Sequence, residues 1–264
     1  MASRESVVYK NQKEMEKLRE AGRLTANALR ITAMAVKPGV SLLELDKIAE
    51  NYIRKQGGSP SFKGYHGFPS TICTSVNDHV VHGIPNHYIL RDGDLITIDC
   101  GAKLDGFHGD TCMSIAVGQV SEQIKRLIKA TKLAITTGIG YCSIGYRLGD
   151  MASAVQACAE DRGYSIVREY IGHGIGRKLH EPPQVMYADI RPNTGFRMEQ
   201  GMTITVEPIL NIGSHHCVVE PDGWTVRTAD GKLSAQFEHT VAITKNGPWI
   251  LSAPDPELKL EDDF

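Results

Sequence analysis

The stretch DLITIDCGAKLDGFHGDTCMSIAV, residues Asp94 to Val117, decides how this chain folds. It predicts two strands joined at Asp105-Gly106, because Asp-Gly suits a tight two-residue hairpin turn. With that turn, Asp99 faces Cys112 and shares a face with Asp110, its diagonal neighbour about 7–8 Å away at the backbone. Two converging carboxylates repel each other, so we expect a metal ion between them. The alternative is two unrelated solvated aspartates, since antiparallel sheets often leave one face wet.

The same pattern returns in the second half of the chain. GDLITID, residues Gly93 to Asp99, aligns with GMTITVE, residues Gly201 to Glu207. The second strand also recurs, because GDTCMSIAV around Asp110 aligns with FEHTVAIT around Glu238. We interpret the chain as one helix–helix–hairpin unit that has been duplicated. The two halves are then expected to face each other across a carboxylate-lined centre.

Helix signals complete the duplicated unit. Capping-box patterns at Asn11–Glu14 and Ser41–Glu44 predict two helices, the first reaching about Val36 and the second ending at Gly57-Gly58. Further helices are expected near 121–138 and 146–162, and strands near 165–170, 202–210, 217–219, 225–227 and 235–244. These elements predict an α+β fold in a single domain over 1–264. Residues 1–12 are expected to form a short N-terminal extension and 253–264 an acidic tail.

Composition restricts the class of protein. A chain of 264 residues can bury a substantial core. Its formal net charge of −2 gives no general attraction to nucleic acid or to an anionic membrane. It contains no apolar run long enough to span a bilayer, and residues 1–12 lack a secretory signal. Its six scattered cysteines do not form a zinc-finger or disulfide pattern. We expect a cytoplasmic protein with no membrane association and no nucleic-acid specificity.

The candidate metal ligands can now be counted. Asp99, Asp110, Glu207 and Glu238 bring four negative charges, which two divalent ions balance, and His173 supplies a neutral fifth ligand. Alone, His173 would be a loop histidine, but beside four carboxylates a ligand role is favoured. Oxygen-rich ligation with one imidazole suits Mn, Fe or Co better than a thiolate zinc site. Two metals about 3.5–4 Å apart can hold a bridging hydroxide and polarise a carbonyl, which is a hydrolase arrangement.

Four segments in this order, IDCGAKLDGFHGDT, EYIGHGIGRKLHEPPQV, MTITVEPIL and SAQFEHTVAIT, resemble type I methionine aminopeptidase from about Met15 to Leu251. The resemblance implies the pita-bread (creatinase/aminopeptidase) fold, with two pseudo-symmetric halves around an antiparallel sheet. It implies removal of the initiator methionine from nascent polypeptides when the second residue is small (Ala, Ser, Gly, Thr, Cys, Pro or Val). It also implies two divalent ions per chain (Co, Mn, Fe or Zn) on the five ligands. A monomer is expected, and the resemblance allows a transient ribosome contact.

The resemblance also assigns roles around the metals. His82 and His180 are expected to contact the substrate near the scissile bond, and Glu207 to handle the proton of the metal-bound water. Both histidines could instead brace loops, but their matched places in the two halves favour function. A monovalent cation, Na or K, is expected near Asn77 and Ser234. The methionine pocket falls on Phe62, Tyr65, His66, Phe68, Cys73, Leu179 and Trp224.

Three of these pocket positions depart from the familiar bacterial pattern. That pattern often has Cys, Tyr and Phe where this chain has Phe62, Phe68 and Leu179. All stay apolar or aromatic, so a thioether should still fit, although pocket shape and inhibitor selectivity are in doubt. The alternatives to this function are a prolidase-like peptidase of the same fold and a non-catalytic protein-binding relative. Prolidases usually carry a sizeable N-terminal domain before the first helix. Non-catalytic relatives typically lose metal ligands, whereas all five are present in this sequence.

Overall fold

The computed structural model describes residues 6–258. The ends of the predicted N-terminal extension and acidic tail, 1–5 and 259–264, lie outside this range. In chain order the elements are α1 (Gln12–Met34), α2 (Leu42–Lys55), β1 (Ser59–Pro60), η1 (Tyr65–Gly67), β2 (Ile72–Val76), β3 (His79–Val81), β4 (Leu95–Leu104), β5 (Phe107–Ala116), α3 (Glu122–Gly140), α4 (Leu148–Glu160), β6 (Ser165–Ile166), β7 (Gly172–Gly174), β8 (Glu181–Val185), β9 (Thr203–Val206), β10 (Ile209–Asn211), β11 (Cys217–Val219), β12 (Val226–Thr228), β13 (Ser234–Gln236), β14 (His239–Thr244), β15 (Gly247–Ile250) and η2 (Pro256–Leu258).

The central hairpin has the predicted register. β4 and β5 are paired along their whole length, with Leu104 opposite Phe107 and Asp99 opposite Cys112. Asp105 and Gly106 both have positive φ, 48° and 83°. Positive φ at both central residues is what a type I′ turn requires, and that turn matches the twist of the two strands. Asp110 therefore lies diagonally across from Asp99 on the same face.

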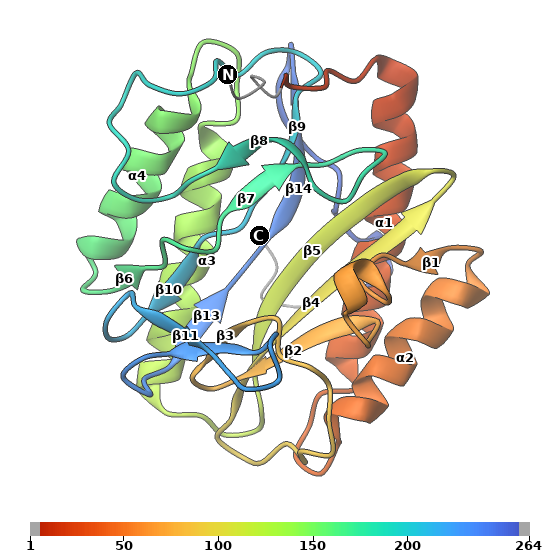
Figure 1. Cartoon of the computed structure of the whole chain (residues 1–264), viewed down its shortest axis with the longest axis vertical. Coiled ribbons are helices and arrows are strands. Elements are labelled where there is room, and N and C mark those ends of the chain that lie inside the picture. Colours follow the sequence, from red (N-terminus) through yellow and green to blue (C-terminus); the bar gives the residue numbers. More distant parts are fainter. Residues whose placement is uncertain (1–5, 259–264) are drawn as a thin grey trace.

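The duplicated unit is visible in the backbone. α1 and α2 precede the hairpin β4–β5, and α3 and α4 precede the paired strands β9 and β14. Gly93 and Gly201 start the two repeated segments with nearly equal φ, 93° and 88°. Their N–H groups donate to Val117 O and Ile243 O, both at 2.9 Å. Figure 1 shows the two helix pairs on opposite sides of the long strands.

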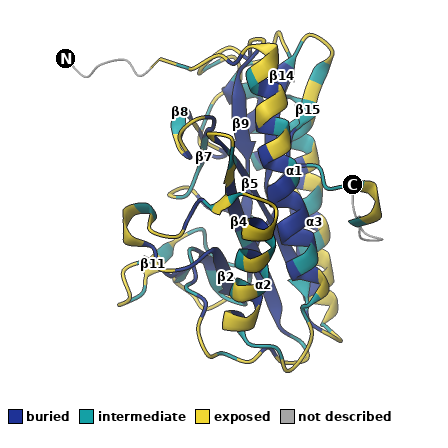
Figure 2. Ribbon diagram, turned by 90° about the vertical axis from the view of Figure 1, so that its right-hand side faces the viewer, coloured by how far each residue is buried: buried dark blue, intermediate teal, exposed yellow. Residues whose placement is uncertain are grey.

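The two halves meet where β5 runs beside β13 and β14. Glu238 N–H donates to Cys112 O at 3.1 Å. Thr111 Oγ1 donates to Glu238 O at 2.6 Å, and Gln236 N–H donates to Ser114 Oγ at 2.9 Å. Figure 2 shows α1, α2 and α3 along one side of the strands, with β7, β8 and β11 on the other. The helices cover the apolar side of the sheet, so the polar side remains for a site.

Two predicted strands, 202–210 and 235–244, are each interrupted at a candidate ligand. The first divides into β9 and β10 at Glu207-Pro208, because proline has no N–H to donate to a ladder. The second divides into β13 and β14, because Glu238 gives its N–H to Cys112 of the other half. The prediction of continuous strands was therefore wrong at these points. Each break turns a carboxylate out of its ladder and toward the centre.

The other predicted elements hold with small changes. The four predicted helices are confirmed, with ends that differ by no more than two residues. Asn11 and Ser41 each make both hydrogen bonds of a capping box. The strand predicted at 165–170 is shorter, since only β6 pairs with β10, while residues 169–171 line a cavity between the two halves. Within 6–258, no helix combines the length and apolarity needed to cross a membrane.

The N-terminal residues before α1 are part of the packed structure. The side chain of Lys10 is buried, and its backbone N–H donates to Gly201 O at 2.8 Å. At the other end, Asp255 N–H donates to Asn27 Oδ1 of α1 at 2.9 Å. Lys10, within the predicted N-terminal extension, is therefore packed against the second half of the chain.

Gly109→Ala should destabilise the protein by about 1–3 kcal/mol, the usual effect of overpacking. A Cβ at Gly109 would lie 2.6 Å from both Ala21 O and Gly22 Cα, so β5 and α1 would have to separate. The control is Gly140→Ala at the end of α3, where the added Cβ would have no described atom within 4 Å apart from its chain neighbours and the nearby backbone of its own helix. That change should be neutral or slightly stabilising, because alanine favours helix. Urea unfolding of both variants measures the difference, and equal stability would contradict the close α1–β5 packing.

Candidate metal centre and active site

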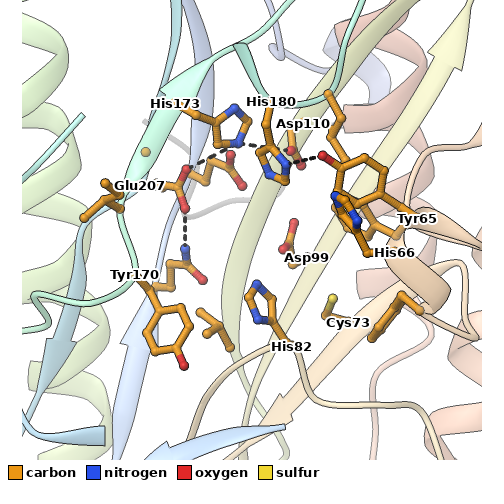
Figure 3. A pocket seen from close by; sticks show the side chains of 18 of the residues that line it. Tyr65, His66, Cys73, His82, Asp99, Asp110, Tyr170, His173, His180 and Glu207 are labelled. Atoms are coloured by element: carbon orange, nitrogen blue, oxygen red, sulfur yellow. Dashed lines mark hydrogen bonds and ion pairs between the residues drawn. The ribbon is translucent and has the colours of Figure 1, made fainter. Parts of the chain in front are cut away.

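A cavity of about 540 Å³ opens on the polar side of the sheet, between the two halves. All five predicted metal ligands line it, together with His82 and His180 and all seven residues of the predicted methionine pocket. Figure 3 shows Asp99 of β4, Asp110 of β5 and His173 of β7 converging with Glu207, His82 and His180 from the surrounding loops. The sequence repeat therefore brings residues from both halves into one site.

Three ligand candidates are close enough to share an ion. Ligand atoms of Asp110, His173 and Glu238 all lie within 4.8 Å of one another. His173 Nε2 lies 3.8 Å from Asp110 Oδ2 and 3.8 Å from Glu207 Oε1. The orientation of the imidazole is fixed at its other nitrogen, because Nδ1 contacts Gly174 O at 2.9 Å. A backbone carbonyl at Nδ1 leaves Nε2 directed at the carboxylates, as in many metal sites.

The carboxylates are unfavourably placed without a cation. Burial, more than any other cause, raises the pKa of Asp99 to about 7 and of Glu207 to about 8. The pKa values of Asp110 and Glu238 are raised well above their ordinary range, by burial and then by the other carboxylates. Asp99 Oδ1 and Asp110 Oδ1 are buried with no hydrogen-bond partner among residues 6–258. These orphaned oxygens and the oxygen-rich donor set fit divalent metal ions.

Burial favours the neutral form of three histidines of the site, His173, His82 and His180. Burial lowers the pKa of His173 to about 3 and of His82 to about 4, and it also lowers the pKa of His180. A neutral imidazole is the form that binds a metal, so the shift at His173 suits a ligand. His180 contacts Tyr65 Oη through Nδ1 at 2.7 Å. Its ring lies 4.2 Å from that of His173, centroid to centroid.

One wall of the cavity is apolar. Phe62, Phe68, Cys73 and Leu179 form a buried cluster, against which Tyr65 and Trp224 pack. The rings of Phe68 and Trp224 meet edge to face, with centroids 5.2 Å apart. His66 is exposed at the mouth and has a φ of 47°, in the left-handed region. This wall offers an unbranched apolar side chain a closed surface beside the metal ligands.

Some residues of the site were missed by the sequence prediction. Thr205 Oγ1 donates to Glu207 Oε1 at 2.6 Å, and Gln236 Nε2 donates to Glu207 Oε2 at 3.2 Å. Glu207 N–H donates to Tyr187 Oη at 2.8 Å. Thr205 and Gln236 each stand two residues from a ligand, a period-two spacing that could have identified them. No such pattern marks Tyr187, which reaches the site from a loop.

His108 lies outside the cavity, whereas the two residues predicted to bind a monovalent cation lie next to each other. The hairpin register predicts His108 on the face of Asp99, but His108 does not line the cavity, and its Nδ1 contacts Ser61 Oγ at 2.8 Å. Asn77 and Ser234 do lie together, since Ser234 N–H donates to Asn77 O at 3.0 Å. Ser234 Oγ is buried without a partner in the described part of the chain.

Comparisons with known proteins place the chain in a family. Residues 16–245 match the model of metallopeptidase family M24. A methionine aminopeptidase from Clostridium perfringens is 45% identical, over 93% of this chain and 98% of that protein. The crystal structure of a methionine aminopeptidase from Rickettsia prowazekii has a TM-score of 0.92 and 42% identity, covering 94% of this chain and 100% of that one.

A prolidase structure shares the fold of this chain at low sequence identity. A prolidase from Pyrococcus furiosus has a TM-score of 0.76 but only 21% identity, and the match covers 94% of this chain and 66% of that one. Such a likeness shows the fold alone. The two structural comparisons together confirm the predicted pita-bread fold. The chain belongs to metallopeptidase family M24 and, within it, to the methionine aminopeptidases.

Proposed function

We propose that this chain removes N-terminal methionine from polypeptides whose second residue is small, with two divalent ions held by its five ligands. The cluster of Asp99, Asp110, His173, Glu207 and Glu238 around one cavity carries the proposal. Four carboxylates carry four negative charges, which two divalent ions would balance. The intact ligand set favours catalysis over a non-catalytic relative, and the identity to methionine aminopeptidases favours that activity over a prolidase.

Ions bound there would polarise the scissile carbonyl and lower the pKa of the attacking water. Glu207 is the residue we assign to the proton of that water. Its two carboxylate oxygens are fixed by Thr205 and Gln236, so it cannot rotate freely away from the cavity. A positioned base of this kind must lie within hydrogen-bond reach of the proton it takes.

His82 and His180 are assigned to the substrate amide. Burial lowers the pKa of both, which favours the neutral ring with one donor and one acceptor. Tyr65 Oη occupies Nδ1 of His180 and leaves Nε2 for a substrate group. Asn77 and the hydroxyl of Ser234, unpartnered among the described residues, support a monovalent-cation site, which we propose for K or Na outside the cavity.

Substrate choice should depend on the shape of the cavity. The apolar wall of Phe62, Phe68, Cys73 and Leu179 accepts the thioether. The five proposed ligands and His180 line the same cavity as this wall. We expect them to crowd the residue on the far side of the scissile carbonyl. A long or charged second residue is then excluded by steric overlap.

Steady-state cleavage of matched peptides tests the proposal. Met-Ala-Ser should be hydrolysed with a kcat/KM at least about 10-fold above that of Met-Lys-Ser. Ala-Ala-Ser, which lacks the methionine side chain, and Ala-Pro, a dipeptide cut by prolidases, should be poor substrates. Equal rates for the Ala and Lys peptides would contradict the proposed second-residue specificity. Preferential cleavage of Ala-Pro would instead support the prolidase alternative.

A further inference from the structure

A buried cation joins the start of the chain to the active-site side of the second half. Lys10 Nζ lies 2.6 Å from Glu181 Oε2, and the two side chains are only 3% and 6% exposed. The same ammonium donates to Val8 O at 2.9 Å. Burial lowers the pKa of Lys10, whereas Glu181 acts in the opposite direction. A lysine this deeply buried is tolerated only when it is paired.

Glu181 directly follows the loop that carries two residues of the site, Leu179 and His180. Residues 175–180 connect β7 to β8, and Glu181 opens β8 directly after His180. Glu181 Oε1 accepts from Lys178 N–H at 3.1 Å, so one carboxylate holds both the loop and Lys10. Leu179, 2% exposed, contributes to the apolar wall. The ion pair is therefore one residue from His180 and two from Leu179.

The loop is packed closely against the ion pair. A Cβ at Gly176 would lie 2.6 Å from Glu181 Oε1 and 2.6 Å from Lys10 Cε, so a larger residue there would displace the paired side chains. The carbonyl of Gly176 accepts from His108 N–H at 2.9 Å, which ties the loop to β5. Lys10 is held in turn by its own N–H, which donates to Gly201 O. The loop thus lies between β5 on one side and the N-terminal segment on the other.

We propose that Lys10 is a positioning residue for this site: its ion pair with Glu181 fixes the 175–181 loop and with it His180 and Leu179. The inference rests on the proposed function of His180. Tyr65 fixes the imidazole ring at Nδ1, and Lys10 fixes the backbone that carries the ring. A displacement of about 1 Å at a group that contacts substrate can lower the rate by up to about 10²-fold.

The test separates positioning from stability with a double variant. Lys10→Met alone leaves an unpaired buried carboxylate and should lower the melting temperature. Adding Glu181→Gln removes that charge but keeps an acceptor for Lys178 N–H, so the melting temperature should largely recover. The kcat for Met-Ala-Ser should nevertheless stay at least about 10-fold below that of the wild type, at equal metal content. Lys17→Met, an exposed site on α1, is the control and should keep full activity.

Hydrogen exchange of the loop gives a second readout. Amides of 175–181 should exchange faster in the metal-loaded double variant than in the wild type, while those of the central hairpin stay unchanged. A double variant with recovered stability, wild-type kcat and unchanged loop exchange would show that the pair is only structural. If the wild type itself fails to cleave methionine peptides, the proposed function is wrong. Loop exchange would then decide about Lys10 independently of it.

Discussion

Replacing Glu207 by glutamine should reduce the turnover of Met-Ala-Ser by at least about 10²–10⁴-fold, the usual contribution of a positioned general base. Glutamine keeps the size of the side chain, but its amide cannot accept the proton of the attacking water. Its NH₂ group would also face either the hydroxyl of Thr205 or the amide of Gln236, which now donate to the two carboxylate oxygens. Because Glu207 is also a proposed ligand, the loss could exceed this range.

The control for Glu207→Gln is Glu160→Gln, which removes an exposed carboxylate at the end of α4. It should leave turnover unchanged. Circular dichroism and metal analysis show whether the Glu207 variant is folded and still binds at least one ion. A folded variant that hydrolyses the peptide at the wild-type rate would show that Glu207 is neither the base nor an essential ligand.

The hairpin and the internal repeat were predictable because both depend on local, short-range rules. Asp105-Gly106 fixes the turn, the turn fixes the register, and the register places Asp110 beside Asp99. The repeat then identifies Glu207 and Glu238 as the matching carboxylates in the second half from the sequence alignment alone. Capping boxes at Asn11 and Ser41 fixed the helix starts for the same reason.

The features that sequence patterns could not predict depend on contacts between segments that are distant in the chain. Glu238 leaves its strand because its N–H reaches Cys112, a pairing that exists only after the two halves dock. Tyr187 reaches Glu207 from a loop, so no periodicity could indicate it. Lys10 was predicted to lie in a short extension, since nothing nearby in sequence shows its partner 171 positions away.

Removing one carboxylate should have opposite effects on activity and on the stability of the metal-free protein. Asp99→Asn deletes a charge that the proposed second ion would need, and we expect activity to fall at least about 100-fold. Even the groups that support metal ligands typically contribute 10–100-fold, so a ligand should contribute no less. After loading with Mn²⁺ or Co²⁺, the wild type should hold two ions per chain and the variant at most one, by elemental analysis. Glu238→Gln should behave in the same way.

Without metal, the same substitution should stabilise the fold. Burial raises the pKa of Asp99 to about 7 and of Glu207 to about 8. In the unfolded chain these carboxyls titrate at about 4. Between these pH values the native state holds protons that the unfolded chain has released, so its stability falls as pH rises. Metal-free Asp99→Asn loses one such group and should therefore melt above metal-free wild type at pH 8, with a smaller difference near pH 4.

Two measurements can contradict this account of the charges. Full activity of Asp99→Asn with an unchanged content of two ions would mean that Asp99 is not needed for either ion. A metal-free variant that melts below the wild type at pH 8 would mean that the ionised Asp99 carboxylate does not destabilise the metal-free fold. Added Mn²⁺ should stabilise the wild type more than the variant, because an ion that binds only the native state shifts unfolding by mass action.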